Sequence, residues 1–441
     1  MNAHHSKPSR VWITGTGAIT PSGLNVADTW QAVQHGHSGI GALEGEEFEG
    51  LSVRIGGQVR GFNAEDHVPR HLARRLEDFH LWAIAAADQA LEEAADIQAS
   101  PSGASSADLP WDPARVMIVT ATGSGPIRPQ QRAALAYAED GQRGVPLTLS
   151  IHGAPDSPAA LISQRHGITG PAHAVSATCA SGAVGLGEAL RALRHGYADA
   201  AIVIGVEDCI NPANLASNAN MRALASGFND HPQEASRPFD RDRAGFVMSA
   251  GAAAIVLESD AAVRRRGGQA LAELAGFGSS SDAHHATAPD PEGRGAAAAM
   301  RAALADAGLT PEDFATGGPA GAPLGHVNAH GTSTSAGDAA EARALEAVFG
   351  DAVSQIPVTA VKSSTGHLLG AGGVLEAIIS VCALRDGVIP PTVNLDVPDF
   401  PKLDVVAARK PLDRAGPCMS AVLSNSFGFG GHNGSVLIRT V

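Results

Sequence analysis

Short apolar runs rich in β-branched residues alternate along the chain with longer stretches rich in Ala and Leu. The first kind predicts buried strands and the second predicts helices, a combination typical of an α/β protein. The predicted strands cover residues 11–17, 116–123, 200–207, 252–259, 326–332 and 420–427. The clearest predicted helices cover residues 81–95 and 293–308. Segments 95–114 and 316–325, rich in Pro with Ser or Gly, predict surface loops.

Two predicted helices resemble each other. The segment after Cys179 is SGAVGLGEALRALRHG, and the segment after His367 is LLGAGGVLEAIISVCALRDG. Each begins with small residues, continues through Glu-Ala and ends in Leu-Arg-x-Gly, which predicts a helix that stops at glycine. The alignment requires a gap, so it indicates a duplication without proving one. We place the boundary between the two halves near residue 260, which gives segments 1–260 and 261–441.

The composition narrows the class of protein. The chain has 441 residues, 44% hydrophobic and 17% charged, which is close to a typical globular protein and allows a large core. Its formal net charge is −14, which argues against a nucleic acid as partner, because phosphate binding needs a net basic surface. A local basic patch for an acidic protein partner remains compatible with this charge.

The cysteines and the apolar segments bear on the cellular compartment. The four cysteines show no CxxC or metal-ligand spacing, so we expect no disulfide framework, no metal site and a reducing environment. The first 17 residues contain no apolar run of signal-peptide length. No segment reaches the roughly 20 apolar residues of a membrane span. The sequence therefore predicts a cytoplasmic protein.

Cys179, in VSATCASGAVG, is the first candidate for chemistry. It follows a strand-like run and precedes small residues that begin a helix. A helix N-terminus and nearby backbone N–H groups favour a thiolate, and a thiolate is nucleophilic. The alternative is a buried, unreactive cysteine, which is the more common role of a single cysteine.

Two further motifs place polar side chains at similar strand-to-helix junctions. NAHGTSTSAGD contains His330, and KSSTGHLLGAGG contains Lys362 and His367. Each histidine alone could be structural. Together they indicate a site in which neutral imidazoles donate hydrogen bonds to an enolate beside a thioester carbonyl, with a cation nearby. The glycine-rich SNSFGFGGHNGS lacks the Gly-Lys-Ser/Thr of a phosphate loop and fits a flap that approaches a ligand closely.

These four motifs, in this order, resemble those of the β-ketoacyl-[acyl carrier protein] synthase family, and the elongating synthase I/II branch most of all. The resemblance covers nearly the whole chain, from RVWITGTGAITPSGLNVADTW through EASRPFDRDRAGFVM to the C-terminal loop. It implies a thiolase fold, in which two similar halves form five α/β/α/β/α layers. It also implies a homodimer, with a heterodimer of related subunits as the alternative, and no cofactor.

The resemblance also implies roles for the candidate residues. Cys179 would take the acyl chain from an acyl carrier protein as a thioester, and malonyl carrier protein would then lose its carboxylate. His330 and His367 would stabilise the enolate, which attacks the acyl group and lengthens the chain by two carbons. Lys362 would act on the two histidines through its charge.

Further residues would support this chemistry. By the same resemblance, Glu376 and Asp338 would hold the catalytic groups in place. The backbone N–H groups of Cys179 and Phe429 would form an oxyanion hole, and Phe429 would gate the acyl pocket. The carrier protein would dock on a basic surface, for which the candidates are Arg70, Arg74, Arg75 and Arg222. The alternative for these arginines is a solvated helix face.

The chain departs from the family pattern at several positions. Relatives usually have a branched apolar residue at Pro126, an apolar wall at residues 155–158, which here include Asp156 and Ser157, and Thr at His432. These departures leave the acyl length and the pathway open, so a ketosynthase of a specialised polyketide or polyene pathway is the first alternative. A non-catalytic chain-length-factor-like subunit and a thiolase are less favoured, because Cys179 is present and the C-terminal loop has no second cysteine.

Overall fold

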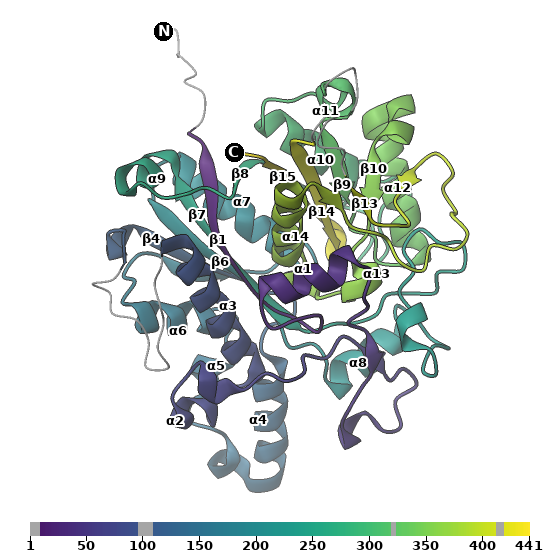
Figure 1. Cartoon of the computed structure of the whole chain (residues 1–441). Coiled ribbons are helices and arrows are strands. Elements are labelled where there is room, and N and C mark those ends of the chain that lie inside the picture. The colour runs from purple at the N-terminus through teal and green to yellow at the C-terminus, as the bar shows by residue number, and fades with distance from the viewer. Residues whose placement is uncertain (1–8, 96–108, 319–322, 412–418) are drawn as a thin grey trace.

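The structure, a computed structural model, describes residues 9–95, 109–318, 323–411 and 419–441 (Figure 1). The longer strands are β1 (Val11–Ile19), β4 (Val116–Ala121), β5 (Ala172–Val175), β6 (Ala200–Glu207), β7 (Gly251–Ser259), β8 (Ala272–Ser281), β9 (Gly325–Asn328), β14 (Ala421–Gly428) and β15 (His432–Arg439). The short strands are β2 (Gly41–Ala42), β3 (Ile55–Gly56), β10 (Pro357–Thr359), β11 (Val388–Ile389), β12 (Asp404–Val405) and β13 (Lys410–Pro411).

The helices connect these strands. Those of the first half are α1 (Val26–Gln34), α2 (Arg70–Ala73), α3 (Asp78–Ala95), α4 (Ile127–Asp140), α5 (Leu149–His152), α6 (Ser157–His166), α7 (Ser181–Arg194), α8 (Pro212–Asn220) and α9 (Asp260–Arg266). Those that follow are α10 (Arg294–Asp306), α11 (Pro311–Thr316), α12 (Ser335–Phe349), α13 (Lys362–Thr365) and α14 (Gly372–Asp386). None of the helices in the described ranges is long and apolar enough to cross a membrane.

The strand pairing repeats along the chain. Within the described residues, eleven strands form a sheet in the order β12-β10-β9-β14-β15-β8-β1-β7-β6-β4-β5. In the first half, β1 and β6 flank β7 in antiparallel pairing, and β4 and β5 continue parallel to β6. In the second half, β8 and β14 flank β15 in the same way, and β9 and β10 continue in parallel. Within the described part of the sheet, the two halves join where Trp12 and Ile13 of β1 pair with β8.

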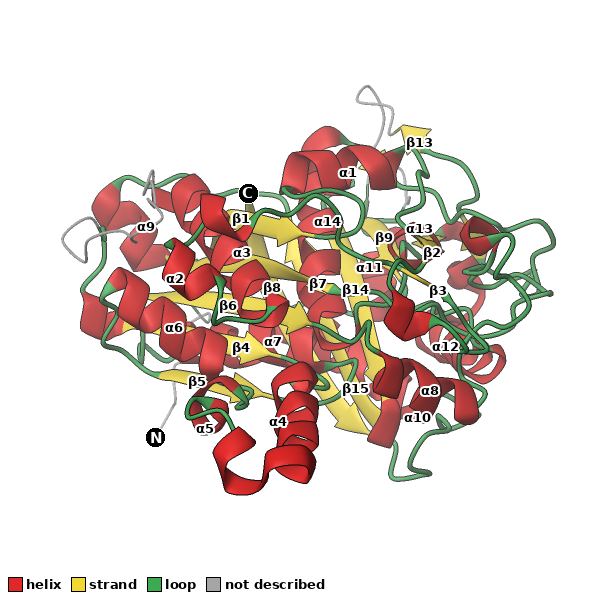
Figure 2. Ribbon diagram, turned by 90° about the horizontal axis from the view of Figure 1, so that it is seen from below, coloured by secondary structure: helices red, strands yellow, loops and turns green. Residues whose placement is uncertain are grey.

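The helices make five layers with the two halves of the sheet (Figure 2). Helices α7 and α14 pack against each other and against strands of both halves, so they form the central layer. Helices α3 and α6 cover the outer face of the first half, and α10, with α12 packed on it, covers the outer face of the second. The expected duplicated halves and five α/β/α/β/α layers are confirmed.

Two glycines allow the backbones of the central helices α7 and α14 to come into contact. A Cβ added to Gly182 of α7 would lie 2.7 Å from the Val374 nitrogen, and one added to Gly373 of α14 would lie 2.7 Å from the Ala183 nitrogen. Only glycine permits this approach. Residues from Gly372 to Ala383 of α14 are all buried, as expected for a helix enclosed on every side. The contact brings the N-termini of both helices together.

The six strands predicted from sequence correspond to β1, β4, β6, β7, β9 and β14, and the two helices correspond to α3 and α10. The predicted strand 326–332 is too long, because β9 ends at Asn328. Strands β5, β8, β10 and β15 were not predicted from the sequence. Strands β8 and β15 each contain Gly and Ser residues, which have a weak strand propensity, and pairing with neighbouring strands outweighs it. Most of the predicted loop 95–114 lies outside the described residues. So do residues 319–322 of the predicted loop 316–325.

The glycine contact leads to a stability prediction. Gly373→Ala is expected to lower the free energy of unfolding by about 1–3 kcal/mol, the usual cost of overpacking, although alanine is the better helix former. Denaturant unfolding followed by circular dichroism would measure the change. The matched control is Gly41→Ala, whose added Cβ would meet only the flexible Arg60 guanidinium at 3.4 Å. Equal effects of both substitutions would contradict the prediction.

Candidate active site

Cys179 lies in a tight turn between β5 and α7. The preceding residue, Thr178, has a φ of +50°, a left-handed conformation that is costly for a threonine. Its Oγ1 donates to the Phe429 carbonyl at 2.8 Å, and the Ala177 N–H donates to Ser181 Oγ at 2.8 Å. The turn is therefore fixed both by its own helix and by the C-terminal glycine-rich segment.

The end of β14 supports this turn from the other half of the protein. A Cβ added to Gly428 would lie 2.9 Å from the Cys179 nitrogen, so only glycine allows the strand to reach the nucleophile. The next residue, Phe429, begins a 3₁₀ turn that ends at Gly431. The Gly430 N–H donates to the Ala286 carbonyl at 2.7 Å, which ties this turn to a second loop at the cavity.

His330 follows β9 and is held through its backbone. The His330 N–H donates to Glu341 Oε1 at 2.9 Å, and the Gly331 N–H donates to Oε2 at 2.8 Å. Asn425 of β14 also donates to Glu341 Oε1, at 3.1 Å. Neither Glu341 nor Asn425 was identified from the sequence. The available signal for Glu341 was its position three residues after Asp338 on one helix, which puts both on the same face.

His367 lies between α13 and α14 and pairs with an extended segment of the first half. Its N–H donates to the Val247 carbonyl at 2.8 Å, and the Ser249 N–H donates to its carbonyl at 3.0 Å. The His330 and His367 rings are 5.3 Å apart between centroids and meet edge to face at 82°. Phe246 packs on the far side of His367, at 5.4 Å between centroids. The two imidazoles are thus in contact and rigidly oriented.

Lys362 forms a buried ion pair with Glu376. The Lys362 ammonium donates to Glu376 Oε1, and both side chains are only 3% exposed. Burial raises the pKa of Glu376 to about 7, and the charge of Lys362 opposes this rise. Lys362 is the first residue of α13 and Glu376 lies on α14, so the pair spans the turn that carries His367.

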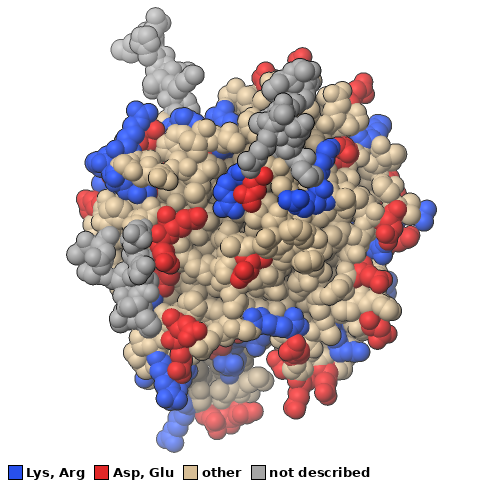
Figure 3. Space-filling view, in the orientation of Figure 1, with Lys and Arg blue, Asp and Glu red and all other residues tan. Residues whose placement is uncertain are grey.

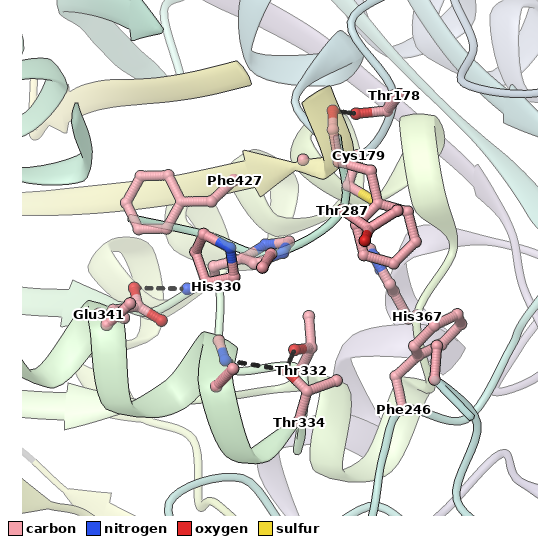
Figure 4. A pocket seen from close by; sticks show the side chains of 18 of the residues that line it. Thr178, Cys179, Phe246, Thr287, His330, Thr332, Thr334, Glu341, His367 and Phe427 are labelled. Atoms are coloured by element: carbon pink, nitrogen blue, oxygen red, sulfur yellow. Dashed lines mark hydrogen bonds between the residues drawn. The ribbon is translucent and has the colours of Figure 1, made fainter. Parts of the chain in front are cut away.

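The candidate nucleophile and the two histidines converge on one cavity of about 560 Å³ (Figure 4). Its lining includes Cys179, His330, His367, Phe427 and Phe429, and Arg222 lines it as well. Lys362 and Glu376 do not line the cavity. The structure therefore brings the predicted nucleophile and both predicted histidines to one space, with the predicted lysine behind them.

Burial sets the protonation of the histidines. The pKa values of His330 and His367 both lie well below the usual imidazole value, first because burial disfavours the charged ring and second because Lys362 repels it. Both rings are therefore neutral at physiological pH. Their Nδ1 atoms have no hydrogen-bond partner among the described residues.

Burial also determines the pKa of the Cys179 thiol. It raises this pKa, whereas the sequence led us to expect a lowered one. It raises the pKa of Cys179 to about 12, although Lys362 and backbone hydrogen bonds from Phe429 and Cys179 lower it. The helix terminus and N–H groups were expected to favour a thiolate. That expectation is wrong, because loss of hydration raises the pKa of the thiol more than the nearby hydrogen-bond donors and Lys362 lower it.

Asp338 and Glu207 hold backbone around the cavity. Asp338 accepts the Phe239 N–H at 2.8 Å and the Ser333 N–H at 3.1 Å, so it joins two loops and does not hydrogen-bond to either histidine. Glu207, at the end of β6, was not identified from the sequence. It accepts hydrogen bonds from the Thr122 hydroxyl at 2.9 Å and from the backbone N–H groups of Gly123 and Ser124. Gly123 and Ser124 form part of the cavity wall. Burial raises the pKa of each carboxyl to about 7.

The candidate docking arginines fall into two groups. Arg222 follows α8 and lines the cavity. Arg70, Arg74 and Arg75 are exposed on or directly after α2, and α2 and α8 lie well apart in both Figures 1 and 2. Basic and acidic side chains are interspersed over the face seen in Figure 3. The arginines therefore do not form one continuous patch on a single subunit.

The positions that depart from the family pattern are not at the histidine pair. Pro126 is buried and directly precedes α4. Asp156 precedes α6, and the buried Ser157 lies 3.0 Å from Nε2 of His80. His432 begins β15 and lies against Gly430 of the Phe429 turn, where an added Cβ would be 3.0 Å from its ring. Among the described residues, no group of three or more His, Cys, Asp or Glu side chains is placed to hold a metal ion.

Comparisons with known proteins identify the family of the chain. Residues 8–262 match the family model of the β-ketoacyl synthase N-terminal domain, and residues 271–396 match that of the C-terminal domain. The chain is 38% identical over 434 residues to 3-oxoacyl-[acyl-carrier-protein] synthase 2 of Vibrio cholerae, covering 98% of this chain and 99% of that protein. The Synechocystis protein of the same name is 37% identical, with 96% of each chain covered.

Solved structures show the same architecture. A β-ketoacyl synthase from Burkholderia phymatum is 30% identical with a TM-score of 0.84, covering 98% of this chain and 100% of that one. The ishigamide ketosynthase/chain length factor is 29% identical with a TM-score of 0.83 and the same coverage. The fold and the site define a thiolase-fold ketosynthase, as expected. The chain belongs to the β-ketoacyl synthase family.

The buried thiol leads to a prediction on reactivity. Because only the thiolate reacts with iodoacetamide, alkylation of Cys179 is expected to rise close to tenfold per pH unit from pH 7 to pH 10 without a plateau, as its pKa is about 12. Mass spectrometry of the alkylated peptide would measure the rate, and Cys179→Ala would give the background from the other cysteines. A rate that levels off between about pH 9 and pH 10 would show an ordinary thiol, whose pKa is about 8.5, and would contradict the prediction.

Proposed function

We propose that this protein is a 3-oxoacyl-[acyl carrier protein] synthase that condenses malonyl carrier protein with an acyl chain held on Cys179. The observation that supports this most strongly is the convergence of a buried cysteine at a helix N-terminus with two neutral histidines in one cavity. Relatives of nearly equal length carry the name of this activity.

In the first half-reaction, the Cys179 sulfur attacks the thioester carbonyl of the acyl carrier protein. A new C–S bond forms, and the bond to the phosphopantetheine sulfur breaks. The thiol proton must be removed during the attack, because the thiol is protonated in the free site. A neutral imidazole can accept it and pass it to the leaving thiolate. The backbone N–H groups of Cys179 and Phe429 would hold the negative oxygen of the intermediate.

In the second half-reaction, malonyl carrier protein loses carbon dioxide and leaves an enolate. His330 and His367 would donate hydrogen bonds to the enolate oxygen, which requires the N–H of a neutral ring and a fixed orientation. The enolate carbon then forms a C–C bond with the acyl carbonyl, and the bond to the Cys179 sulfur breaks. The Cys179 thiolate released in this step takes up one proton from water, and the products are carbon dioxide, the free enzyme and a 3-oxoacyl chain two carbons longer.

Lys362, Glu376 and Asp338 are positioning residues in this scheme. Burial keeps the two histidines neutral, the Lys362 charge adds to this effect, and Glu376 holds the ammonium in place. Asp338 fixes the loop that follows His330. We also propose that the chain divides near residue 260 into a half that carries the nucleophile and a half that carries both histidines and Lys362.

The proposed partner is an acyl carrier protein that brings acyl and malonyl groups on a phosphopantetheine arm. A solved relative with 25% identity and a TM-score of 0.84 is a polyketide ketosynthase in complex with its acyl-carrier protein. Docking would use Arg222 at the cavity and the arginines of α2. Since these lie apart on one subunit, a carrier protein that contacts both is best explained by a dimer that brings α2 of one subunit near the cavity of the other.

A dimer is also supported by the unpaired edge of the sheet. Strand β5 is the last strand on its side, and an open edge invites pairing with another chain. The neighbouring α4–α5 segment exposes four large apolar side chains, Leu135, Tyr137, Leu147 and Ile151. We propose a homodimer through this face. Three free cysteines among the described residues support the proposed cytoplasmic location.

A ketosynthase of a polyketide or polyene pathway remains the second candidate. It uses the same chemistry, and a solved relative at 25% identity is a type II polyketide ketosynthase. A non-catalytic chain-length-factor-like role is disfavoured by the intact Cys179 beside both histidines.

Acyl transfer can be tested directly. On incubation with a panel of acyl carrier protein thioesters, the intact protein is expected to gain the mass of the acyl chain, and Cys179→Ala is expected to gain none. His330→Ala is expected to keep this gain and to lose condensation with malonyl carrier protein by about 10²–10⁴-fold, because it lacks an enolate donor. Mass spectrometry and product assay would measure the two steps. No mass gain with any chain would reject an independent synthase.

The dimer can be tested by light scattering after size exclusion. The wild-type protein is expected at twice the chain mass of 44.7 kDa, and Leu147→Asp with Ile151→Asp is expected to shift it toward the monomer, because buried carboxylates would face an apolar partner surface. Tyr197→Asp, at an exposed position after α7, is the matched control. A monomeric wild-type protein would instead favour assembly with a related subunit.

A further inference from the structure

Glu207, at the end of β6, is a buried carboxyl that the proposed mechanism does not use. Its side chain is completely buried and does not line the cavity. Two other buried carboxyls of the site, Asp338 and Glu376, each lie beside a cation, Arg243 or Lys362. None of the described Lys, Arg or His side chains forms an ion pair with Glu207. When it is ionised, Glu207 therefore carries a buried negative charge that no ion pair balances.

Glu207 holds the three residues that follow β4 through one carboxylate oxygen. Its Oε1 accepts hydrogen bonds from the Thr122 hydroxyl at 2.9 Å, from the Ser124 N–H at 3.0 Å and from the Gly123 N–H. Its Oε2 accepts no hydrogen bond of normal geometry from the described residues, although the Gly370 N–H lies near enough to lower the pKa of the carboxyl. The contacts with this segment thus need one acceptor oxygen and no negative charge.

The same segment packs against the turn that carries the nucleophile. The Ser181 Oγ lies 3.1 Å from the Thr122 carbonyl oxygen and 2.6 Å from the Thr178 carbonyl oxygen, so it joins the two. A Cβ added to Gly123 would lie 3.0 Å from the Thr178 carbonyl oxygen and 3.2 Å from Glu207 Oε1. Glu207 and the nucleophile turn therefore contact the same glycine from two sides.

Glu207 and Lys362 act on the thiol with opposite signs. Burial raises the pKa of Cys179 most, Lys362 then lowers it, and Glu207 raises it further. His330 and His367, which share the cavity with the thiol, are neutral and add no charge. The Glu207 carboxylate is thus a charge beside the nucleophile that favours the thiol over the thiolate.

The neighbours of Glu207 in the chain do not replace this effect. Asp208 forms an ion pair of 2.9 Å with Arg128, and although burial raises its pKa to about 6, it is not among the principal influences on the pKa of Cys179. Cys209 is a buried thiol whose pKa lies well above the usual value, first because of burial and second because of Glu207. Burial raises the pKa of Glu207 itself to about 7, so it gains its charge near neutral pH.

We propose that Glu207 is a positioning residue that holds the segment after β4 against the nucleophile turn and, through its negative charge, keeps the resting Cys179 protonated. Electrophiles and oxidants attack the thiolate and spare the thiol, so this charge protects the nucleophile between turnovers. The inference rests on the proposed role of Cys179 and assigns the control of its protonation.

The test removes the charge and keeps the hydrogen bonds. In Glu207→Gln, the amide oxygen can accept the hydrogen bonds that Oε1 accepts. Methyl methanethiosulfonate, which transfers a methylthio group to a thiolate, would label Cys179, and peptide mass spectrometry would measure the rate. At pH 9 the variant is expected to react about threefold faster than the wild-type protein, because a like charge no longer opposes the thiolate. At pH 5.5 the rates are expected to be equal, because Glu207 is then protonated.

Glu93→Gln is the matched control. Glu93 Oε2 likewise accepts hydrogen bonds from a threonine N–H and hydroxyl, those of Thr16, and Glu93 does not line the cavity. This variant is expected to react at the wild-type rate at both pH values. Equal rates for Glu207→Gln and the wild-type protein at pH 9 would overturn the inference. So would a rate ratio that is the same at pH 5.5 and pH 9, since a loosened turn would give that result without any effect of charge.

The wild-type protein provides a second measurement that does not depend on the folding of a variant. Its labelling rate is expected to rise about 40-fold from pH 6 to pH 8 and about 85-fold from pH 8 to pH 10, because Glu207 gains its charge in the lower interval. Equal rises in the two intervals would contradict the proposed role. Labelling does not require acyl transfer, so a failure here would leave the proposed condensation standing, and a failure to load acyl chains would leave the labelling result unchanged.

Discussion

The backbone contact between α7 and α14 determines where Cys179 lies relative to His367 and Lys362. Gly182 and Gly373 let the two helices meet without side chains between them. Cys179 lies just before one helix, and His367 lies just before the other. Glu376 extends from the second helix to Lys362. A widening of this contact would separate the nucleophile from the groups that stabilise the enolate, so the central layer is both the core of the fold and the frame of the site.

Burial then sets the chemistry of the groups that this contact assembles. The same loss of hydration raises the pKa of the Cys179 thiol and lowers those of both histidines. One buried cation, Lys362, acts on all three in a consistent direction, favouring the thiolate and the neutral rings. A buried ion pair contributes little certain stability, so the value of the Lys362–Glu376 pair lies in this fixed field. The thiol and both imidazoles are thus neutral at rest, beside the charged Lys362–Glu376 pair.

The cavity is assembled from segments of both halves. Its catalytic side is formed by loops that follow β9 and β14 and by the turns at α7 and α14, each fixed by backbone hydrogen bonds such as those to Glu341. Its other side includes Arg222, after α8, and the segment around Thr287, neither of which takes part in the enolate chemistry.

The sequence by itself determined the local features of this protein. Long apolar runs located strands such as β1 and β6, and the four ordered motifs identified Cys179, His330, Lys362 and His367 as the site. Strands β8 and β15 escaped prediction, because their Gly- and Ser-containing segments have weak strand propensity and are extended through mutual pairing, although the two strands lie far apart in the sequence. Glu341 and Asn425 escaped for a similar reason, since they lie 84 positions apart in the sequence and meet only in the folded chain. The tertiary structure alone decided the protonation of Cys179, because burial depends on what surrounds a group and local sequence does not record it.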